Sequence, residues 1–314
     1  MPLPRVSVII PNYNHAAFLP QRIESVLNQT FRDFEVILLD DCSPDESRAI
    51  MEKYRVHPQV SQIIYNEKNS GSTFLQWKKG FGFAAGEYIW IAESDDYCEP
   101  NFLERLVSAL DTYPLAGVAY CQSFRVNENG KEINDFRQWK DKDWPSIFYL
   151  EGKEMALDHF LNGRAIPNAS TALFKKSMIP TSNFYTTFRY SGDIIFWLSI
   201  LKKSGIVVVN QRLNYFRKHE KNVSGKVSKN GLDIIESMRV FEYMDTLFDL
   251  PKGSKKQKSI ALAQIFVQNQ LLSQKRVSIS VFIKIIKESV SFDKSFVWKI
   301  LKAGMSKIFK KIHV

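Results

Sequence analysis

At 314 residues, 45% of them hydrophobic, the chain is long enough to bury one large core, or one core and an appendage. Its three scattered cysteines, Cys42, Cys98 and Cys121, argue against a disulfide framework, and no run has the pattern of a signal peptide or the length of a transmembrane helix, so we expect a cytoplasmic protein. The net charge is +10, and it is unevenly distributed: residues 251–314 hold 14 Lys/Arg and two Asp/Glu, whereas residues 1–250 have a net charge of about −2. Because the positive charge belongs to one terminal segment, the sequence argues against a nucleic-acid-binding protein.

The N-terminal half repeats a pattern of strand, turn and helix. Apolar runs and one-sided helical patterns predict strands at 5–10, 34–39, 60–65, 87–92 and 117–122, and helices at 18–27, 45–54, 72–85 and 100–113. Ser43, before Pro44, is the expected cap of the second helix, and Gly86 is the expected end of the third. This alternation predicts an α/β fold, with a mostly parallel sheet that carries helices on both faces.

Residues 87–96, Glu-Tyr-Ile-Trp-Ile-Ala-Glu-Ser-Asp-Asp, join a buried strand to two adjacent carboxylates. In a parallel α/β sheet the ligand crevice lies outside the carboxyl ends of the strands. Asp95 and Asp96 would repel each other there unless a cation or a ligand lay between them, and hard divalent ions bind carboxylate oxygens while keeping positions open for phosphates. The segment therefore predicts a metal and phosphate site, and a solvated turn before the next helix is the alternative.

Other nucleotide-binding and hydrolytic classes lack their motifs here. Pro11-Asn-Tyr-Asn14 follows the first strand in place of a G-x-G-x-x-G loop, and there is neither a P-loop nor a G-x-S-x-G elbow. What remains is a sheet whose strand ends carry Tyr13, Asp40-Asp41 and Asp95-Asp96. An aromatic ring and two acid pairs suit a nucleotide that is held by base stacking, hydrogen bonds and a metal.

Four segments resemble the motifs of a family 2 glycosyltransferase of the GT-A fold, in the same order and at similar spacing. They are residues 6–14 (Val-Ser-Val-Ile-Ile-Pro-Asn-Tyr-Asn), 25–31 (Ser-Val-Leu-Asn-Gln-Thr-Phe), 35–43 (Glu-Val-Ile-Leu-Leu-Asp-Asp-Cys-Ser) and 86–96. The resemblance covers about residues 4–225, which predicts a catalytic domain at 1–225 and a helical region at 226–314 that is basic and amphipathic from about 251. Glu93-Ser-Asp-Asp96 departs from the family's common Asp-x-Asp-Asp only at its first acid.

The resemblance implies roles for five residues at the donor. Tyr13 would stack on the base, with Pro11 beside it, and Asp41 would accept a hydrogen bond from a base N–H, which favours uracil. Asp95 would face the ribose, and Asp96 would bind Mn²⁺ or Mg²⁺. A packed aromatic for Tyr13 and a helix cap or turn residue for Asp41 are the structural alternatives.

The second half supplies two further candidates by the same resemblance. Ser191-Gly-Asp-Ile-Ile-Phe-Trp-Leu198 resembles the family's acidic motif at a helix start, so Asp193 is the expected base, although Gly192 replaces the usual Glu. Residues 214–224 resemble a Tyr-Arg-x-His-x-x-Asn-x-Ser segment, in which His219 would contact the metal or the diphosphate. Asn168 and Ser170 are candidates on the acceptor side. A dipole-stabilised acid and a structural histidine are the alternatives for Asp193 and His219.

The resemblance therefore implies an inverting transferase that moves a sugar from a nucleotide-diphosphate donor to a hydroxyl of a saccharide or a lipid-linked saccharide, in bacterial surface-polysaccharide assembly. A sugar-1-phosphate nucleotidyltransferase would need a Gly-rich basic loop near the N-terminus, and a processive synthase would show Gln-x-x-Arg-Trp and transmembrane helices. A non-catalytic nucleotide-sugar-binding module would be expected to lose some of the acids, and all are present.

The C-terminal segment has no close motif. Helical periodicity over residues 296–312 places Val297, Leu301, Met305, Ile308 and Ile312 on one face and several lysines opposite. A basic amphipathic helix suits an anionic membrane surface. A helix packed on the catalytic domain is the alternative.

Overall fold

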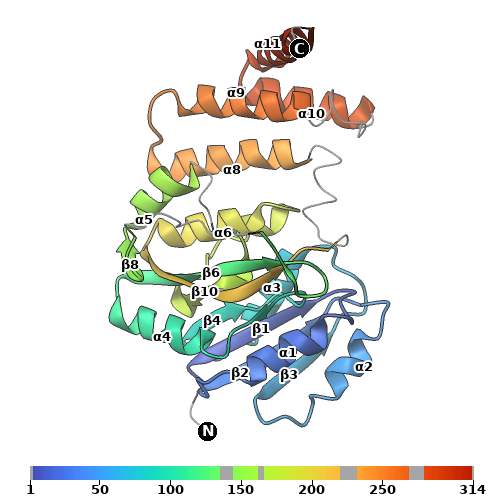
Figure 1. Ribbon diagram of the computed structural model, residues 1–314, viewed down its shortest axis with the longest axis vertical. Helices are drawn as coiled ribbons and strands as arrows, with labels where there is room; N and C mark the ends of the chain where they lie inside the picture. The colour runs from blue at the N-terminus through green and yellow to red at the C-terminus, as the bar shows by residue number, and fades with distance from the viewer. Residues whose placement is uncertain (1–2, 135–143, 162–165, 220–231, 269–278, 313–314) are drawn as a thin grey trace. The chain divides into compact units, whose positions relative to one another are not determined.

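The structure is a computed structural model that describes residues 3–134, 144–161, 166–219, 232–268 and 279–312 (Figure 1). The chain divides into two compact units, Met1–His219 and Glu220–Val314, and the predicted boundary at residue 225 lies outside the described residues. The first unit is an α/β fold and the second is helical in its described parts.

The first unit is built around one large sheet. Its elements are, in chain order, β1 (Val6–Asn12), α1 (Leu19–Leu27), β2 (Phe34–Asp40), α2 (Ser47–Glu52), β3 (Val60–Tyr65), α3 (Thr73–Phe81), β4 (Tyr88–Ile91), β5 (Tyr97–Cys98), α4 (Phe102–Thr112), β6 (Ala116–Val126), β7 (Glu132–Asn134), β8 (Ile147–Leu150), α5 (Gly152–Glu154), η1 (Met155–Phe160), η2 (Ala169–Thr171), β9 (Ala172–Lys175), η3 (Lys176–Met178), η4 (Phe184–Thr187), α6 (Gly192–Leu201) and β10 (Gly205–Arg217). These elements confirm the predicted α/β class.

The strand order is β3-β2-β1-β4-β9-β6-β10-β5, with β7 beside β6 and β8 beside β10. The strands β3, β2, β1 and β4 are parallel, as predicted, and β6 and β10 are also parallel. The strand β9 runs antiparallel between β4 and β6, so the second half of the sheet is mixed. Because β1, β2 and β4 are parallel neighbours, the segments that follow them lie at one edge of the sheet.

Alternate residues of β1 pack on opposite faces of the sheet, as the two-residue period of a strand requires. Val6, Val8 and Ile10 belong to a core with α1 and α4. Ile9 faces α3, where a Cβ added at Gly80 would lie 2.5 Å from the Ile9 Cγ2 atom, so the glycine lets α3 approach the sheet closely. Both faces of β1 are therefore covered.

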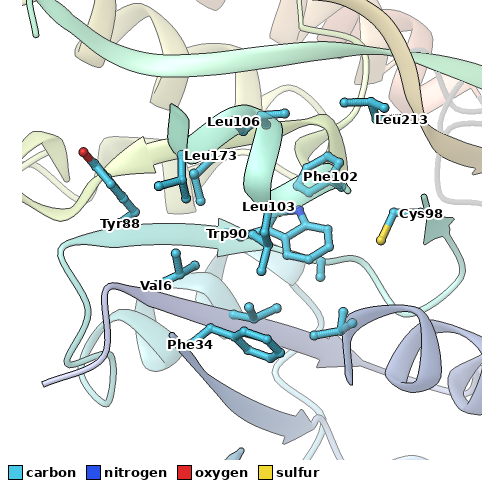
Figure 2. Close-up of a cluster of buried hydrophobic side chains, with 14 of the residues drawn as sticks. Val6, Phe34, Tyr88, Trp90, Cys98, Phe102, Leu103, Leu106, Leu173 and Leu213 are labelled. Atoms are coloured by element: carbon cyan, nitrogen blue, oxygen red, sulfur yellow. The ribbon is translucent and has the colours of Figure 1, made fainter. Parts of the chain in front are cut away.

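The core on the α1 and α4 side centres on Trp90 of β4 (Figure 2). The Trp90 indole is fully buried, stacks on Phe102 with ring centroids 4.3 Å apart, and donates its Nε1–H to the Ser170 carbonyl at 2.9 Å. Truncating a buried Trp to Ala typically costs about 3–5 kcal/mol of stability. This core fixes the end of β4, from which the acidic segment continues.

Two predicted helix boundaries are wrong. The helix α2 begins at Ser47, not at 45, and Ser43 is not its cap; the Ser43 hydroxyl instead accepts hydrogen bonds from Asn12 Nδ2 and from the Asn14 N–H, at 3.1 and 2.9 Å. The helix α3 ends at Phe81, so Gly86 does not terminate it. A Cβ at Gly86 would lie 2.6 Å from the Ser7 nitrogen, which means that close approach to β1 explains this glycine.

The second unit contains α8 (Leu232–Phe248), α9 (Ser254–Phe266), α10 (Ile279–Phe292) and α11 (Phe296–Ile312). Buried Phe241, Phe266 and Phe292 contribute to its core, with the Phe241 and Phe292 ring centroids 5.7 Å apart. In the described part of the chain, no helix is long and apolar enough to span a membrane.

Candidate active site at the end of strand β4

The acidic segment Glu93–Asp96 leaves the sheet at the end of β4, which lies between β1 and β9. The Ala92 N–H still bonds to the Ile9 carbonyl at 2.8 Å, and the chain then turns away from the sheet. The Glu93 N–H donates to Ser170 Oγ at 3.1 Å, so the short helix η2 holds the start of the turn. Three carboxyl groups within four residues are thus fixed at the strand end, where sequence analysis placed the site.

Asp95 lies beside two histidines. Its Oδ2 atom is 3.1 Å from His219 Nε2, and His219 follows the end of β10. The His15 ring is perpendicular to the His219 ring at 5.4 Å, and His15 Nδ1 is 2.9 Å from Ser94 Oγ. One potential ligand atom from each of His15, Asp95 and His219 lies within 4.8 Å of the other two, so these residues form a candidate metal site.

The separation of these atoms fits a divalent ion. Two ligands about 2.1 Å from one octahedral ion, at right angles to each other, lie about 3.0 Å apart. The 3.1 Å between Asp95 Oδ2 and His219 Nε2 is a hydrogen-bond distance in this structure and is close to that spacing, so an ion would replace the hydrogen bond once Nε2 has lost its proton. Burial raises the pKa of Asp95, but the hydrogen bond from His219 and the charges of both histidines outweigh it, and the pKa is below its usual value. Asp95 is therefore ionised at neutral pH, as a metal ligand must be.

Asp96 is held by a different set of groups. Its carboxylate accepts hydrogen bonds from Asn168 Nδ2 and, at 3.0 Å, from the Arg217 N–H, and Arg22 Nη2 is 3.9 Å from Oδ2. Burial and the charge of Asp95 raise the pKa of Asp96 to about 6. The structure thus brings His219 to Asp95, whereas the sequence paired His219 with Asp96.

Two buried arginines brace the acidic segment. Arg22, on the buried face of α1, donates from Nε to the Glu93 carbonyl at 2.9 Å, and its guanidinium lies over the Trp90 ring. Arg217, at the end of β10, donates from Nε to the Asp95 carbonyl at 2.8 Å. Among the described residues, Arg22 Nη1 and Nη2 have no hydrogen-bond partner, so the nearest carboxylate, Asp96, is the charge that compensates this cation.

Glu93 replaces the family's first aspartate and points toward α3. Its Oε1 accepts a hydrogen bond from Trp77 Nε1 at 2.9 Å. Burial and the charge of Asp95 raise the pKa of Glu93 to about 8. The carboxyl is therefore mostly protonated at neutral pH, which reduces the repulsion among the three acids.

The predicted base-binding residues lie at or just beyond the paired ends of β1 and β2. Pro11 is buried in β1 opposite Leu39, and Tyr13, just beyond, is 45% exposed and not a packed core aromatic. Asp41 is 4% exposed and does not cap a helix. Its Oδ1 accepts hydrogen bonds from Asn66 Nδ2, the Ser70 N–H and Gln76 Nε2 at 2.6, 2.8 and 2.9 Å, and Oδ2 accepts one from Ser70 Oγ at 2.7 Å.

Asp193 lies in the first turn of α6, partly buried, and its Oδ1 accepts the Ile194 N–H at 2.8 Å. The preceding glycine has a steric reason, because a Cβ at Gly192 would lie 2.5 Å from the Tyr185 carbonyl oxygen and 2.6 Å from the Phe74 ring. The family's glutamate therefore does not fit this packing. Through Phe196, 5.8 Å from Trp77, α6 also packs on the helix that holds Glu93.

A cleft of about 370 Å³ borders the acidic segment. It is lined by Ala17, Phe18, Gln21, Glu128, Asn129 and Arg217. The Phe18 ring, which lines the cleft, is 4.8 Å from the His219 ring, and Arg217, also in the lining, donates to the Asp95 carbonyl. A cleft of mixed polar and apolar lining near the candidate metal site offers space for a substrate.

Sequence reasoning assigned no role to His15, Arg22 or Arg217. It placed Asn168 and Ser170 on the acceptor side, and in the structure both are buried and bond to the acidic segment. A signal for Arg22 was present, because it shares the helical face of Leu19, Ile23 and Val26, where an unpaired cation would be unfavourable. The predicted motif residues 220–224 lie outside the described part of the chain.

The model of the family described as "Glycosyl transferase family 2" matches residues 7–174, more than half of the chain. The chain belongs to this family. The glycosyltransferase GlyG of Streptococcus pneumoniae is 25% identical over 243 residues, which are 73% of this chain and 74% of that protein. The poly(ribitol-phosphate) β-N-acetylglucosaminyltransferase TarS of Staphylococcus aureus is 27% identical over 264 residues, 81% of this chain but only 42% of TarS.

Solved structures show the same fold. The structure of S. aureus TarS 1–349 in complex with UDP-GlcNAc superposes with a TM-score of 0.66 and 19% identity, over 96% of this chain and 89% of that one. The mannosyltransferase PcManGT of Pyrobaculum calidifontis, in complex with GDP-Man and Mn²⁺, gives a TM-score of 0.56 at 13% identity, over 99% and 87% of the two chains. The GT-A fold of a family 2 glycosyltransferase is thereby confirmed.

Proposed function

We propose that this glycosyltransferase is an inverting enzyme that moves a sugar from a UDP-sugar to a hydroxyl of a saccharide or of a lipid-linked saccharide. The observation that carries the proposal is the His15, Asp95 and His219 group at the end of β4, next to a cleft and in line with the strand ends that carry Tyr13 and Asp41. Family membership favours sugar transfer over a nucleotidyltransferase, and retention of every predicted acid favours an enzyme over a binding module.

The diphosphate would be held at the histidine pair. Asp95 and His219, with His15 beside them, would hold Mn²⁺ or Mg²⁺, which when bound offsets the negative charge that develops on the departing nucleotide. The PcManGT complex with GDP-Man and Mn²⁺ supports such an ion. Asp96 stays a predicted ligand, and its contacts with Asn168 and Arg217 support a role in orienting the segment.

The nucleoside would be held by residues of β1 and β2. Tyr13 offers an exposed ring for stacking on the base, with the buried Pro11 fixing the strand that precedes it. Asp41 Oδ1 already accepts three hydrogen bonds, so only Oδ2 has capacity for a base N–H. Uracil offers one such N–H, whereas guanine offers two side by side and would need both oxygens. The contacts of Asp41 therefore favour a UDP-sugar.

Asp193 would take the proton from the acceptor hydroxyl as the oxygen attacks the anomeric carbon. The bond from the sugar to the diphosphate breaks in the same displacement, so an α-linked donor gives a β-glycoside and no covalent intermediate forms. Asp193 lies in the first turn of α6 and accepts the Ile194 N–H, and the N-terminus of a helix favours an anionic side chain there.

The acceptor class rests on the relatives. TarS is named as a poly(ribitol-phosphate) transferase, and a relative in Campylobacter jejuni, 24% identical over 76% of this chain, is named as a glucosyltransferase acting on an undecaprenol-linked saccharide. These names support bacterial surface-polysaccharide assembly. The unpaired thiols of Cys42, Cys98 and Cys121 support a reducing compartment such as the cytoplasm.

A panel of nucleotide-diphosphate sugars tests the proposal. The full chain is incubated with UDP-, GDP-, CDP- and dTDP-sugars in the presence of Mn²⁺ or Mg²⁺, and release of the nucleoside diphosphate is measured. We expect turnover of at least one UDP-sugar and loss of that turnover in excess chelator. Turnover of GDP-sugars alone would reject the assignment of Asp41, and turnover of none would reject the function.

A further inference from the structure

The second unit holds the whole net charge of the protein. Residues 220–314 carry 18 Lys/Arg and eight Asp/Glu, which accounts for the net +10, whereas residues 1–219 carry 25 of each. Charge of one sign that is concentrated in one unit attracts a surface of the opposite sign over about a Debye length, ~10 Å at 0.1 M salt.

Helix α11 has two apolar sides, of which one is buried and the other exposed among the described residues. Phe296 and Ile300 are buried, and α11 packs against α9 and α10. Val297, Trp298 and Leu301 are 38%, 74% and 50% exposed. At about 100° per residue these three lie on one arc of the helix, apart from the buried pair. An indole that is three-quarters exposed, with two aliphatic neighbours, is an apolar surface that no described residue of this unit covers.

Two exposed lysines belong to the same region. Lys294 and Lys302 are exposed, whereas Lys299 donates to Asp293 and, at 3.1 Å, to Ser259 Oγ and is thus held within the unit. Tryptophan rings favour the level of lipid headgroups, and lysines beside them favour anionic headgroups. This combination separates the exposed side of α11 from an ordinary solvated lysine face.

We propose that the exposed side of α11, formed by Val297, Trp298 and Leu301 with Lys294 and Lys302, docks on an anionic lipid bilayer. The charge of the chain favours an anionic bilayer over a second copy of the chain as the partner of this surface, because a second copy would bring another net +10. Docking does not depend on glycosyl transfer. It would hold the enzyme at the surface where a lipid-linked acceptor lies.

Co-sedimentation of the full chain with vesicles tests the docking. We expect binding to vesicles of phosphatidylglycerol and phosphatidylcholine at low salt, weak binding to phosphatidylcholine alone, and release at high salt. Trp298→Ser should lower the partition coefficient by about tenfold or more, because an indole removes about 150–250 Å² from water on insertion. Lys294→Gln with Lys302→Gln should lower it by about 30-fold at low salt and little at high salt.

Matched controls come from the first unit. Leu115→Ser, at a side chain that is 71% exposed, and Lys53→Gln with Lys131→Gln should leave the partition coefficient unchanged. Binding of Trp298→Ser equal to that of the unsubstituted chain, or equal binding to charged and uncharged vesicles, would overturn the proposal. So would a dimer that dissociates on Trp298→Ser without any vesicle binding, which would assign this surface to a second copy. Co-sedimentation needs neither donor nor acceptor, so vesicle binding can be tested even if the proposed transferase activity is not found.

Discussion

Exchange of one atom at Asp41 should change which base the enzyme prefers. In Asp41→Asn the amide oxygen should keep the Oδ1 position, because three donors from Asn66, Ser70 and Gln76 point at it. The amide NH₂ then occupies the Oδ2 position, where Ser70 Oγ can rotate to accept from it. The new N–H faces the base, so it opposes the N3–H of uracil but can donate to the N3 acceptor of cytosine.

The magnitude follows from the bond that is lost. A hydrogen bond to a charged group contributes about 1.5–3 kcal/mol, and a donor facing a donor forfeits it entirely. UDP affinity should therefore fall by about 10–150-fold, since 1.4 kcal/mol is a factor of ten. CDP affinity should rise or stay unchanged, so the ratio of the two dissociation constants should shift by at least as large a factor as the UDP affinity falls.

Calorimetric titration of UDP and CDP in the presence of Mn²⁺ measures this ratio. Asp40→Asn is the matched control, because Asp40 is fully buried and its carboxylate bonds to Asn12, Ser43 and Arg48. That variant should lower stability without changing the ratio. Unchanged UDP affinity in Asp41→Asn, with a native melting temperature, would show that Asp41 does not contact the base.

Three further predictions concern Asp193, His219 and Glu93. Asp193→Asn should keep UDP affinity and lower transfer by about 10²–10⁴-fold, and a collapse of donor affinity in calorimetry would instead make Asp193 a donor contact. His219→Gln should weaken Mn²⁺ binding in the presence of UDP, and an unchanged manganese affinity would remove His219 from the site. Burial raises the pKa of Glu93 from 4.5 to about 8, so this group binds its proton more tightly in the folded state than in the unfolded chain, and the contribution of Glu93 to stability should be fully present below pH 4.5 and be lost as pH rises to 8. Without metal, the stability of Glu93→Gln relative to that of the unsubstituted protein should therefore increase between pH 5 and pH 9, by at most about 5 kcal/mol. Melting temperatures that change in parallel with pH for the two proteins would contradict the raised pKa.

The sequence was sufficient for the parallel half of the sheet. Apolar runs that end in Pro11, Asp40 or the acidic segment predict buried strands, and parallel neighbours bring their ends to one edge. The antiparallel strand β9 was not predicted, because its pairing with β4 and β6 joins segments that are far apart in the chain. The two-residue strand β5 is too short to leave a period in the sequence.

The position of the site in the fold could be predicted from the sequence, but the side-chain contacts within the site could not. Adjacent residues point in different directions, so no pattern could decide whether Asp95 or Asp96 faces His219, which comes from the end of β10. His15 and Arg217 reach the segment through tertiary packing. Gly192 is understood only from the Phe74 ring and the Tyr185 carbonyl that close over it.

The most direct test of the account is the release of UDP from the preferred UDP-sugar by the unsubstituted enzyme and by Asp95→Asn, each with Mn²⁺ and with chelator. We predict release by the unsubstituted enzyme with Mn²⁺ only, and loss of release in Asp95→Asn at an unchanged melting temperature. Equal release by the two proteins, or release that persists in chelator, would contradict a metal-dependent transfer site at the end of β4.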